Sequence, residues 1–172
     1  FIVRLSFGEV VAGVFGDFRQ GIKEKWHQFH RDRFSAVDWA LLKARQAAAI
    51  KEAREARAQE QKQAADTAIK LWNHAGSVSE SHPYLLRKKV RPLGIRQDGD
   101  ALLIPVQDEQ GKLWSLQKIY PDGSKRFHKN GAVQGNFCPI GQLEGELPVC
   151  ICEGYATGVA IHQMTGYPAV CT

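Results

Sequence analysis

The sequence lacks any apolar run close to the roughly 18 residues that a membrane-spanning helix requires. It also lacks a positively charged start followed by an apolar centre, which is the pattern of a secretory signal. These absences argue against an integral membrane protein. We therefore expect a soluble, cytoplasmic protein without a membrane partner.

Cysteine is scarce as well. The four cysteines, Cys138, Cys150, Cys152 and Cys171, nowhere have the Cys-x-x-Cys spacing of many zinc sites. Cys150 and Cys152 lie two positions apart in an apolar stretch, so a strand there directs both side chains to one face. The pattern favours reduced thiols in a core over a zinc site.

Acidic residues are missing from the most basic part of the chain. The 172 residues carry a formal net charge of +5, and an excess of this sign favours a polyanionic partner. One basic group without any acid consists of Arg87, Lys88, Lys89, Arg91 and Arg96. A second basic group consists of Lys118, Lys125, Arg126 and Lys129.

Glycine and proline are absent from Ala36 to Ala75, where Ala, Gln, Glu, Lys and Arg dominate. This composition predicts one long helix, with Ser35 as its N-cap. The middle of the helix, residues 51–63, is polar on nearly all sides, so we expect a solvated spacer or arm there. A coiled coil is disfavoured because its seam positions lack large apolar residues.

The remaining sequence is rich in strand and turn signals, and 44% of all residues are hydrophobic, which suffices for a core. Runs such as Ala101–Val106 and Leu113–Ile119, separated by turn residues, predict successive hairpins. We predict an α+β chain with a small β element (1–34), a long connecting helix or linker arm (35–78), a mixed, β-rich basic subdomain (79–146) and the start of an α/β domain (147–172).

Glu153 occupies the most informative position. Val149–Cys152 is predicted to be a buried strand, Gly154 breaks the extended pattern, and Ala156–Met164 has helical spacing. Glu153 is thus expected at the carboxyl end of a strand, facing the N-terminus of the next helix. Ligands bind at this edge of open α/β sheets, and a helix N-terminus suits phosphate oxygens. Gly154 and Thr157 are therefore candidate phosphate contacts.

An ordered series of motifs surrounds Glu153. In chain order the motifs are His82–Leu85, Leu102–Val106, Asp108 with Gly111, Ser115–Gln117, Pro121–Gly123, Lys125–Phe127, Ile140–Gly141, Glu153–Thr157, Ile161–His162 and Thr165–Gly166. By this series, residues 79–172 resemble the Toprim-type primase region of plasmid-transfer and phage primase or primase–helicase proteins. The first third of the chain is similar to such proteins only in outline.

The resemblance implies synthesis of short RNA primers on a single-stranded DNA template from nucleoside triphosphates, by metal-dependent nucleotidyl transfer. It implies that residues 147–172 form the first βαβ unit of a Toprim α/β fold. Glu153 matches the family's catalytic glutamate, expected to act as general acid or base near Mg²⁺ and to be a candidate Mg²⁺ ligand. A replicative helicase is a further candidate partner.

The two basic groups suit phosphoryl transfer, which depends on positioning and charge neutralisation. Lys125 and Arg126 are candidate contacts for the phosphates of the incoming nucleotide. Candidate contacts for the nucleic-acid backbone are Arg87, Lys88, Lys89 and Arg91. The competing interpretation of each group is a solvated charged face. The missing acids favour binding.

Other interpretations stay open. A Toprim nuclease or a part of a topoisomerase would keep the same fold, but a topoisomerase needs a nucleophilic tyrosine that the sequence does not identify. A non-catalytic module that binds single-stranded nucleic acid or docks a helicase is a second alternative. The Asp98-Gly99-Asp100 triplet precedes a strand, and its glycine favours a tight turn over a pair of metal ligands.

The sequence also predicts limited activity for these residues alone. The family pattern places metal-binding aspartates on the strands after Glu153, and the sequence reaches Thr172 before the first of them, so we expect a piece of a longer polypeptide. We predict that the 172 residues bind Mg²⁺ weakly and make few or no primers on a single-stranded template. Robust primer synthesis in a gel-based assay would contradict this prediction.

Overall fold

The structure is a computed structural model that describes residues 2–7, 10–17, 22–27 and 36–172. The chain divides into two compact units, Phe1–Glu52 and Ala53–Thr172. Each unit is considered by itself.

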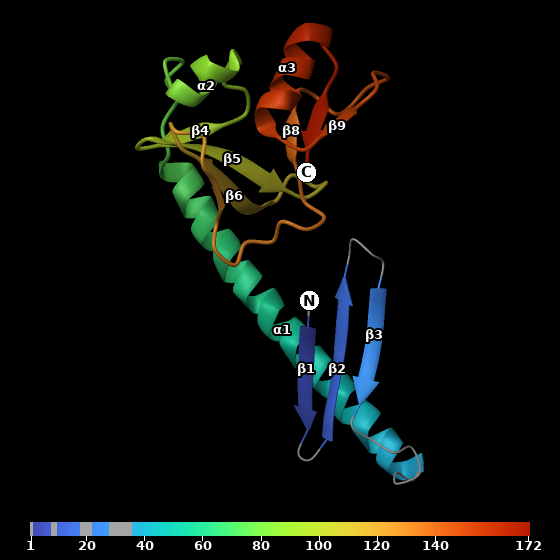
Figure 1. The fold of residues 1–172 in the computed structure, drawn as a ribbon. Coiled ribbons are helices and arrows are strands. Elements are labelled where there is room, and N and C mark those ends of the chain that lie inside the picture. The colour runs from blue at the N-terminus through green and yellow to red at the C-terminus, as the bar shows by residue number, and fades with distance from the viewer. Residues whose placement is uncertain (1, 8–9, 18–21, 28–35) are drawn as a thin grey trace. The chain divides into compact units, whose positions relative to one another are not determined.

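The first unit contains a three-stranded antiparallel sheet (Figure 1). Its strands are β1 (Ile2–Phe7), β2 (Val10–Asp17) and β3 (Ile22–His27). The small β element predicted from the sequence is therefore present. Its predicted end, at residue 34, lies outside the described residues.

The long helix predicted from the absence of glycine and proline is confirmed as α1 (Ala36–His74). Residues 43–60 are exposed on every side, as the polar composition of the helix middle requires. Near its end, three alanines become buried, and Ala68 packs in a small core with Leu103 and Leu116. Within the described part of the chain, no helix combines the length and apolar character needed to cross a bilayer.

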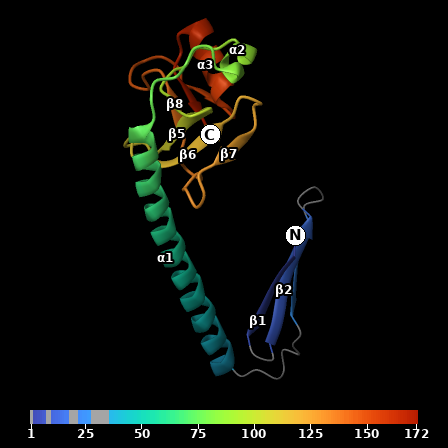
Figure 2. The same cartoon turned by 90° about the vertical axis from the view of Figure 1, so that its left-hand side faces the viewer.

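The second unit is a mixed α+β arrangement with two sheets (Figures 1 and 2). The first sheet is antiparallel, and its strands in order are β4 (Arg96–Asp98), β5 (Ala101–Gln107), β6 (Leu113–Ile119) and β7 (Lys125–Phe127). The second sheet has the order β8 (Cys138–Ile140), β10 (Ala169–Cys171) and β9 (Cys150–Cys152). The helices α2 (Pro83–Lys88) and α3 (Tyr155–Thr165), together with the part of α1 from Ala53 onward, complete the unit.

The four-stranded sheet separates two cores because successive side chains of a strand point to opposite faces. One face, with Leu103 and Leu116, packs against the end of α1. The other face, with Leu102 and Ile104, belongs to a larger core that also contains buried residues of α2, α3 and the second sheet. Figures 1 and 2 show α2 and α3 on the side of the sheet away from α1.

The predicted βαβ unit is present, because β9 leads through α3 into β10 and the two strands pair in parallel. Helix α3 lies very close to this sheet at Gly158. A Cβ at that position would come within 2.7 Å of Ile140 Cδ1 and 2.8 Å of Cys171 Sγ. Only glycine allows this approach without displacing core side chains.

The prediction of a buried strand before Glu153 was wrong in one respect. Cys150 and Cys152 do share a face and pack against the larger core. Ile151, on the opposite face, is 76% exposed. The reason is that β9 is an edge strand of its sheet and α3 covers only the cysteine face.

The four cysteines are free thiols, and Cys152 Sγ lies 3.4 Å from Cys171 Sγ. Burial, with a smaller contribution from the neighbouring Cys152, raises the pKa of the Cys138 thiol from 9.0 to about 12. Burial likewise raises the pKa values of Cys171 and Tyr155. These groups therefore remain neutral in the folded chain at a pH where the unfolded chain ionises.

Stability should consequently fall at alkaline pH. The contribution of Cys138 is fully present below its unfolded pKa of 9.0 and is lost as the pH rises toward about 12. We expect the free energy of unfolding to fall by about 1.4 kcal/mol per pH unit for each such group in its window. Urea unfolding across this range measures the slope, which Cys138→Val should reduce. If Cys138→Val leaves the pH dependence of the free energy of unfolding unchanged, the raised pKa of Cys138 does not contribute to it, and this prediction is wrong.

Candidate phosphate-binding site

A polar pocket of about 300 Å³ lies where α2, the turn between β6 and β7, and the beginning of α3 meet. It brings together five of the residues predicted from the sequence, although they come from three separate segments. These residues are Arg87, Lys88, Lys125, Gly154 and Thr157. Tyr84, Asp122, Gly123 and Ala156 complete the lining.

Arg87 is held at this pocket by the turn opposite α2. Its Nη2 donates a hydrogen bond of 3.1 Å to the Pro121 carbonyl. The guanidinium also lies against Gly123, where a Cβ would come within 2.9 Å of Nη2. Gly123 has a φ of +91°, which favours glycine. The turn thus provides both an acceptor and the space that Arg87 needs.

Lys125 reaches the pocket from β7. Its Nζ lies 3.7 Å from the position that a Cβ on Gly154 would occupy. The ammonium is therefore beside the first turn of α3. A longer side chain at residue 154 would crowd this space.

The beginning of α3 presents unpaired backbone donors to the pocket. Gly154 is the N-cap and provides no side-chain hydrogen bond, whereas the Thr157 N–H donates to the Gly154 carbonyl at 3.0 Å. Among the described residues, none accepts a hydrogen bond from the N–H groups of Tyr155 and Ala156. Free N–H groups and the helix dipole both favour an anion here.

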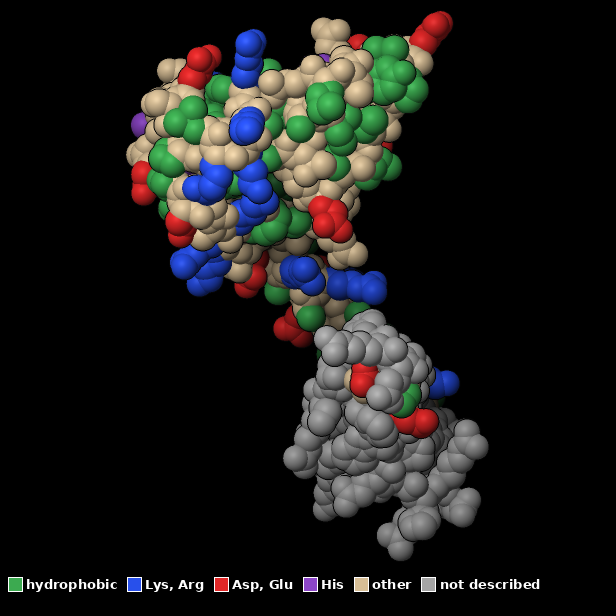
Figure 3. Space-filling model, turned by 45° about the horizontal axis from the view of Figure 1, so that its top comes forward, with side chains coloured by type: hydrophobic (Ala, Val, Ile, Leu, Met, Phe, Trp, Pro, Cys, Tyr) green, Lys and Arg blue, Asp and Glu red, His purple; other side chains and the backbone are tan. Residues whose placement is uncertain are grey.

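The pocket also contains one carboxylate, Asp122. Its Oδ1 accepts a hydrogen bond of 2.8 Å from the Ser124 N–H. Hydrogen bonds from Ser124 hold the Asp122 pKa below its usual value, with a smaller contribution from Arg87. Three cations thus face one carboxylate, and the pocket remains positive. In Figure 3, Lys and Arg side chains gather on the described surface of this unit.

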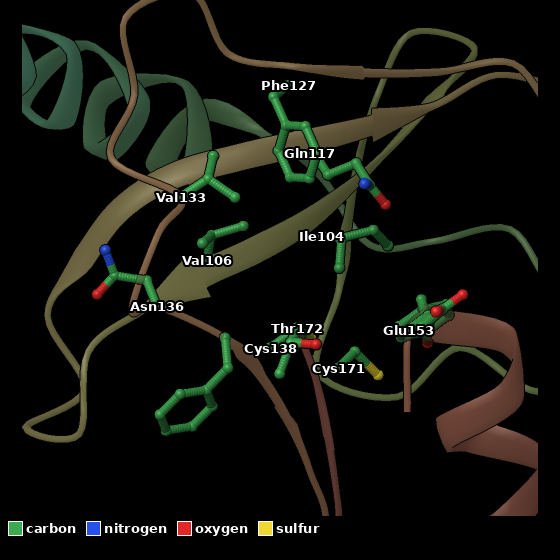
Figure 4. Close-up of a pocket in the computed structure, with 12 residues that line it drawn as sticks. Ile104, Val106, Gln117, Phe127, Val133, Asn136, Cys138, Glu153, Cys171 and Thr172 are labelled. Atoms are coloured by element: carbon green, nitrogen blue, oxygen red, sulfur yellow. The ribbon is translucent and has the colours of Figure 1, made fainter. Parts of the chain in front are cut away.

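Glu153 lies just outside this pocket and faces a second, shallow hollow (Figure 4). The residue is exposed and directly follows β9, as predicted. Its carboxylate forms no hydrogen bond or ion pair with the described residues. Glu153 and Gly154 are thus consecutive residues that line two different depressions.

The other predicted basic residues do not join the pocket. Arg126 pairs with Lys118 in the ladder of β6 and β7, on the face opposite Lys125, and it lines a separate depression with Asp100 and Tyr120. Lys89 ends α2 in the left-handed conformation, with a φ of 56°.

Two further arginines are also placed apart from the pocket. The Arg91 N–H donates to Gln163 Oε1 at 3.2 Å, and the Arg91 side chain is exposed. The Arg96 guanidinium lies 5.0 Å from the centre of the Trp72 ring and donates to the Trp72 carbonyl at 2.8 Å. The basic group is therefore divided by the fold, and only Arg87 and Lys88 face the pocket.

The residues in this region do not form a magnesium site by themselves. The described residues contain no group of three or more His, Cys, Asp or Glu side chains that could hold a metal ion. Glu153 is the single carboxylate that lines its hollow, whereas Mg²⁺ requires six oxygen ligands in near-octahedral geometry. The Asp98-Gly99-Asp100 triplet is the predicted turn between β4 and β5, with Asp98 3.5 Å from the Lys118 ammonium.

Two buried polar residues position this region, and the sequence analysis assigned a role to neither. The Tyr155 hydroxyl accepts a hydrogen bond from the Leu93 N–H at 2.7 Å and donates to the Leu93 carbonyl at 3.0 Å. His82 Nδ1 accepts from the Tyr84 N–H at 3.2 Å, and its Nε2 donates to the Asp100 carbonyl at 3.0 Å. Tyr155 thus fixes the beginning of α3, and His82 fixes the beginning of α2.

His162, which belongs to one of the motifs of the series around Glu153, makes its contacts near the other end of α3. Its Nδ1 donates to the Tyr167 carbonyl at 2.8 Å. Its ring lies against Gly141, where a Cβ would come within 2.7 Å of Cε1. The structure therefore gives His162 a packing contact and a hydrogen bond that closes the loop after α3.

Comparison with known proteins identifies relatives among DNA primases. The chain is 33% identical over 169 residues to a protein named DNA primase TraC from Escherichia coli, covering 92% of this chain and 16% of that protein. A second DNA primase TraC from Escherichia coli is 33% identical over 99 residues, covering 54% of this chain and 7% of that protein. No family model and no solved structure matches the chain. This homology over most of the chain supports a primase family.

The Tyr155 hydroxyl is expected to contribute measurably to stability. Tyr155 is 1% exposed, so Tyr155→Phe leaves the Leu93 N–H and carbonyl without their partner. We expect a loss of about 1–3 kcal/mol in the free energy of unfolding. Tyr167→Phe is the matched control, because the exposed Tyr167 should change stability by less than about 0.5 kcal/mol. Equal effects of the two substitutions in urea unfolding would contradict this role.

Proposed function

We propose that this chain is the N-terminal and early Toprim part of a DNA primase of the plasmid-transfer or phage type, which makes short RNA primers on single-stranded DNA. The similarity to proteins named DNA primase TraC supports the proposal. One structural observation carries it. The Lys125 ammonium lies beside the first turn of α3, which begins directly after Glu153 and Gly154 in the chain. Arg87 and Lys88 line the same pocket.

The proposed division of labour follows from the chemistry of the side chains. Arg87, Lys88 and Lys125 would neutralise phosphate charge, and the free N–H groups at the beginning of α3 would orient phosphate oxygens. Glu153, at the border of the pocket, would act as general acid or base toward a hydroxyl or leaving group. Mg²⁺ enters the proposal through the family resemblance, because the described residues contain no group of three metal-binding side chains. The carboxylates of this region are Asp122 in the pocket and Glu153 in the adjacent hollow.

A second candidate function is a non-catalytic module that binds single-stranded nucleic acid or docks a helicase. The observation in its favour is that the described residues contain no group of three metal-binding side chains. Both candidates use the basic pocket to bind phosphate. They differ in whether Glu153 acts chemically.

The basic pocket is tested by removing one charge at a time. Lys125→Gln should weaken the binding of inorganic tripolyphosphate, measured by calorimetry, by about tenfold, because a charge-assisted hydrogen bond contributes roughly 1.5 kcal/mol or more. It should also reduce the salt dependence of binding to a single-stranded oligonucleotide by a slope of about 0.7 for one lost phosphate contact.

Arg126→Gln is the matched control. It removes the same charge from the next residue of β7, but on the opposite face of the sheet. It should leave the affinity for tripolyphosphate nearly unchanged. Equal losses for the two substitutions would mean that a diffuse charge, and not this pocket, attracts the anion.

A further inference from the structure

We propose that Phe127 is a base-stacking residue, and that the hollow beside Glu153 receives the base of a nucleoside triphosphate whose phosphates lie in the basic pocket. This inference rests on the proposed function, because it needs the pocket to hold phosphate. It adds a second half to the site. It also gives a binding role to Phe127, which the sequence showed only as the end of the Lys125–Phe127 motif.

The basic pocket and the hollow beside Glu153 are neighbours at two places, on β7 and at the beginning of α3. On β7, Lys125 lines the basic pocket, and Phe127 lines the hollow. Alternation places both side chains on the same face, about 7 Å apart along the strand. At the beginning of α3, Gly154 lines the pocket and Glu153 lines the hollow. This spacing is comparable with the distance from the base to the first phosphates of a nucleotide.

Phe127 is suited to stacking because it is 49% exposed on a short edge strand. Its cross-strand partner on the neighbouring strand β6 is Gln117, whose side-chain amide forms no hydrogen bond with the described residues. Figure 4 shows Phe127 and Gln117 next to each other, with Asn136 and Glu153 toward opposite ends of the hollow. Asn136 Nδ2 donates to the Ala132 carbonyl at 3.2 Å, and its amide oxygen has no hydrogen-bond partner in the part of the chain that the structure describes.

Much of the lining of the hollow is apolar and includes Ile104, Val106 and Val133. The enclosed space is only about 30 Å³, so a base would lie flat across the hollow and not inside it. An aromatic ring, apolar lining residues and amide atoms open to hydrogen bonding are the elements that bind a base by stacking and by hydrogen bonds.

The distribution of charge favours a triphosphate over a nucleic-acid strand. Arg87, Lys88 and Lys125 all converge on one pocket beside the free N–H groups of α3. A triphosphate presents three adjacent phosphoryl groups, whereas a strand spreads its charges at one per nucleotide. Clustered cations at one end and a single exposed aromatic at the other end therefore match one nucleotide.

The experiment compares ATP with inorganic tripolyphosphate on the 172-residue chain. Stacking contributes about 1–3 kcal/mol per base, so wild type should bind ATP roughly 5- to 150-fold more tightly than tripolyphosphate. Phe127→Ala should remove most of this preference and leave the affinity for tripolyphosphate unchanged. Phe127→Tyr should retain the preference. Phe127→Leu, which keeps an apolar side chain without a ring, should lose it and serves if Phe127→Ala impairs folding.

The outcomes separate this inference from the proposed function. Equal affinities of wild type for ATP and tripolyphosphate would overturn the stacking role while the phosphate pocket stands. Binding of neither compound would overturn the pocket and the inference together. If Phe127→Ala weakens binding of a single-stranded oligonucleotide but not of ATP, the ring contacts a strand, and the assignment to a nucleoside triphosphate is wrong.

Discussion

The close packing of α3 on the second sheet is the constraint on which the candidate site depends. Gly158 allows the helix to approach Ile140 and Cys171 so closely that a Cβ at this position would overlap them. Parallel pairing of β9 with β10 fixes the strand that leads into the helix. The Tyr155 hydroxyl then holds the first turn through both backbone groups of Leu93. The direction of the α3 N-terminus follows from these three contacts.

Strand alternation decides which basic residues share the site with α3. Lys125 and Arg126 are adjacent in the sequence, yet they point to opposite faces of β7. The face with Lys125 continues into the larger core, where Leu102 and Ile104 lie. The opposite face, with Arg126, continues toward α1. The number of basic residues in the sequence therefore exceeds the number that can contact one phosphate group. Three of them, Arg87, Lys88 and Lys125, line the pocket.

Local patterns in the sequence predicted much of this arrangement. The absence of glycine and proline predicted α1, and the motif around Glu153 predicted the strand, the helix and their order. These features depend on composition and short-range spacing, which a sequence displays directly. The turn at Asp98-Gly99-Asp100 was predicted for the same reason.

Contacts between distant segments were not predictable in the same way. No local pattern indicates that Arg87 donates a hydrogen bond to the Pro121 carbonyl or that the Tyr155 hydroxyl hydrogen-bonds to Leu93. Such pairs form only when several elements pack together. The exposure of Ile151 was also missed, because an apolar run does not tell whether its strand lies at the edge or in the middle of a sheet.

The central claim is that the first turn of α3 and the cations around it form one phosphate site. The most direct measurement is a titration of the ¹⁵N-labelled 172-residue chain with inorganic pyrophosphate, followed by amide chemical shifts. The account predicts that the largest shifts occur at Tyr155, Ala156 and Thr157, with smaller shifts at Gly123 and Lys125. Shifts that instead centre on Lys89, Arg91 or Arg126, with α3 unaffected, would contradict it.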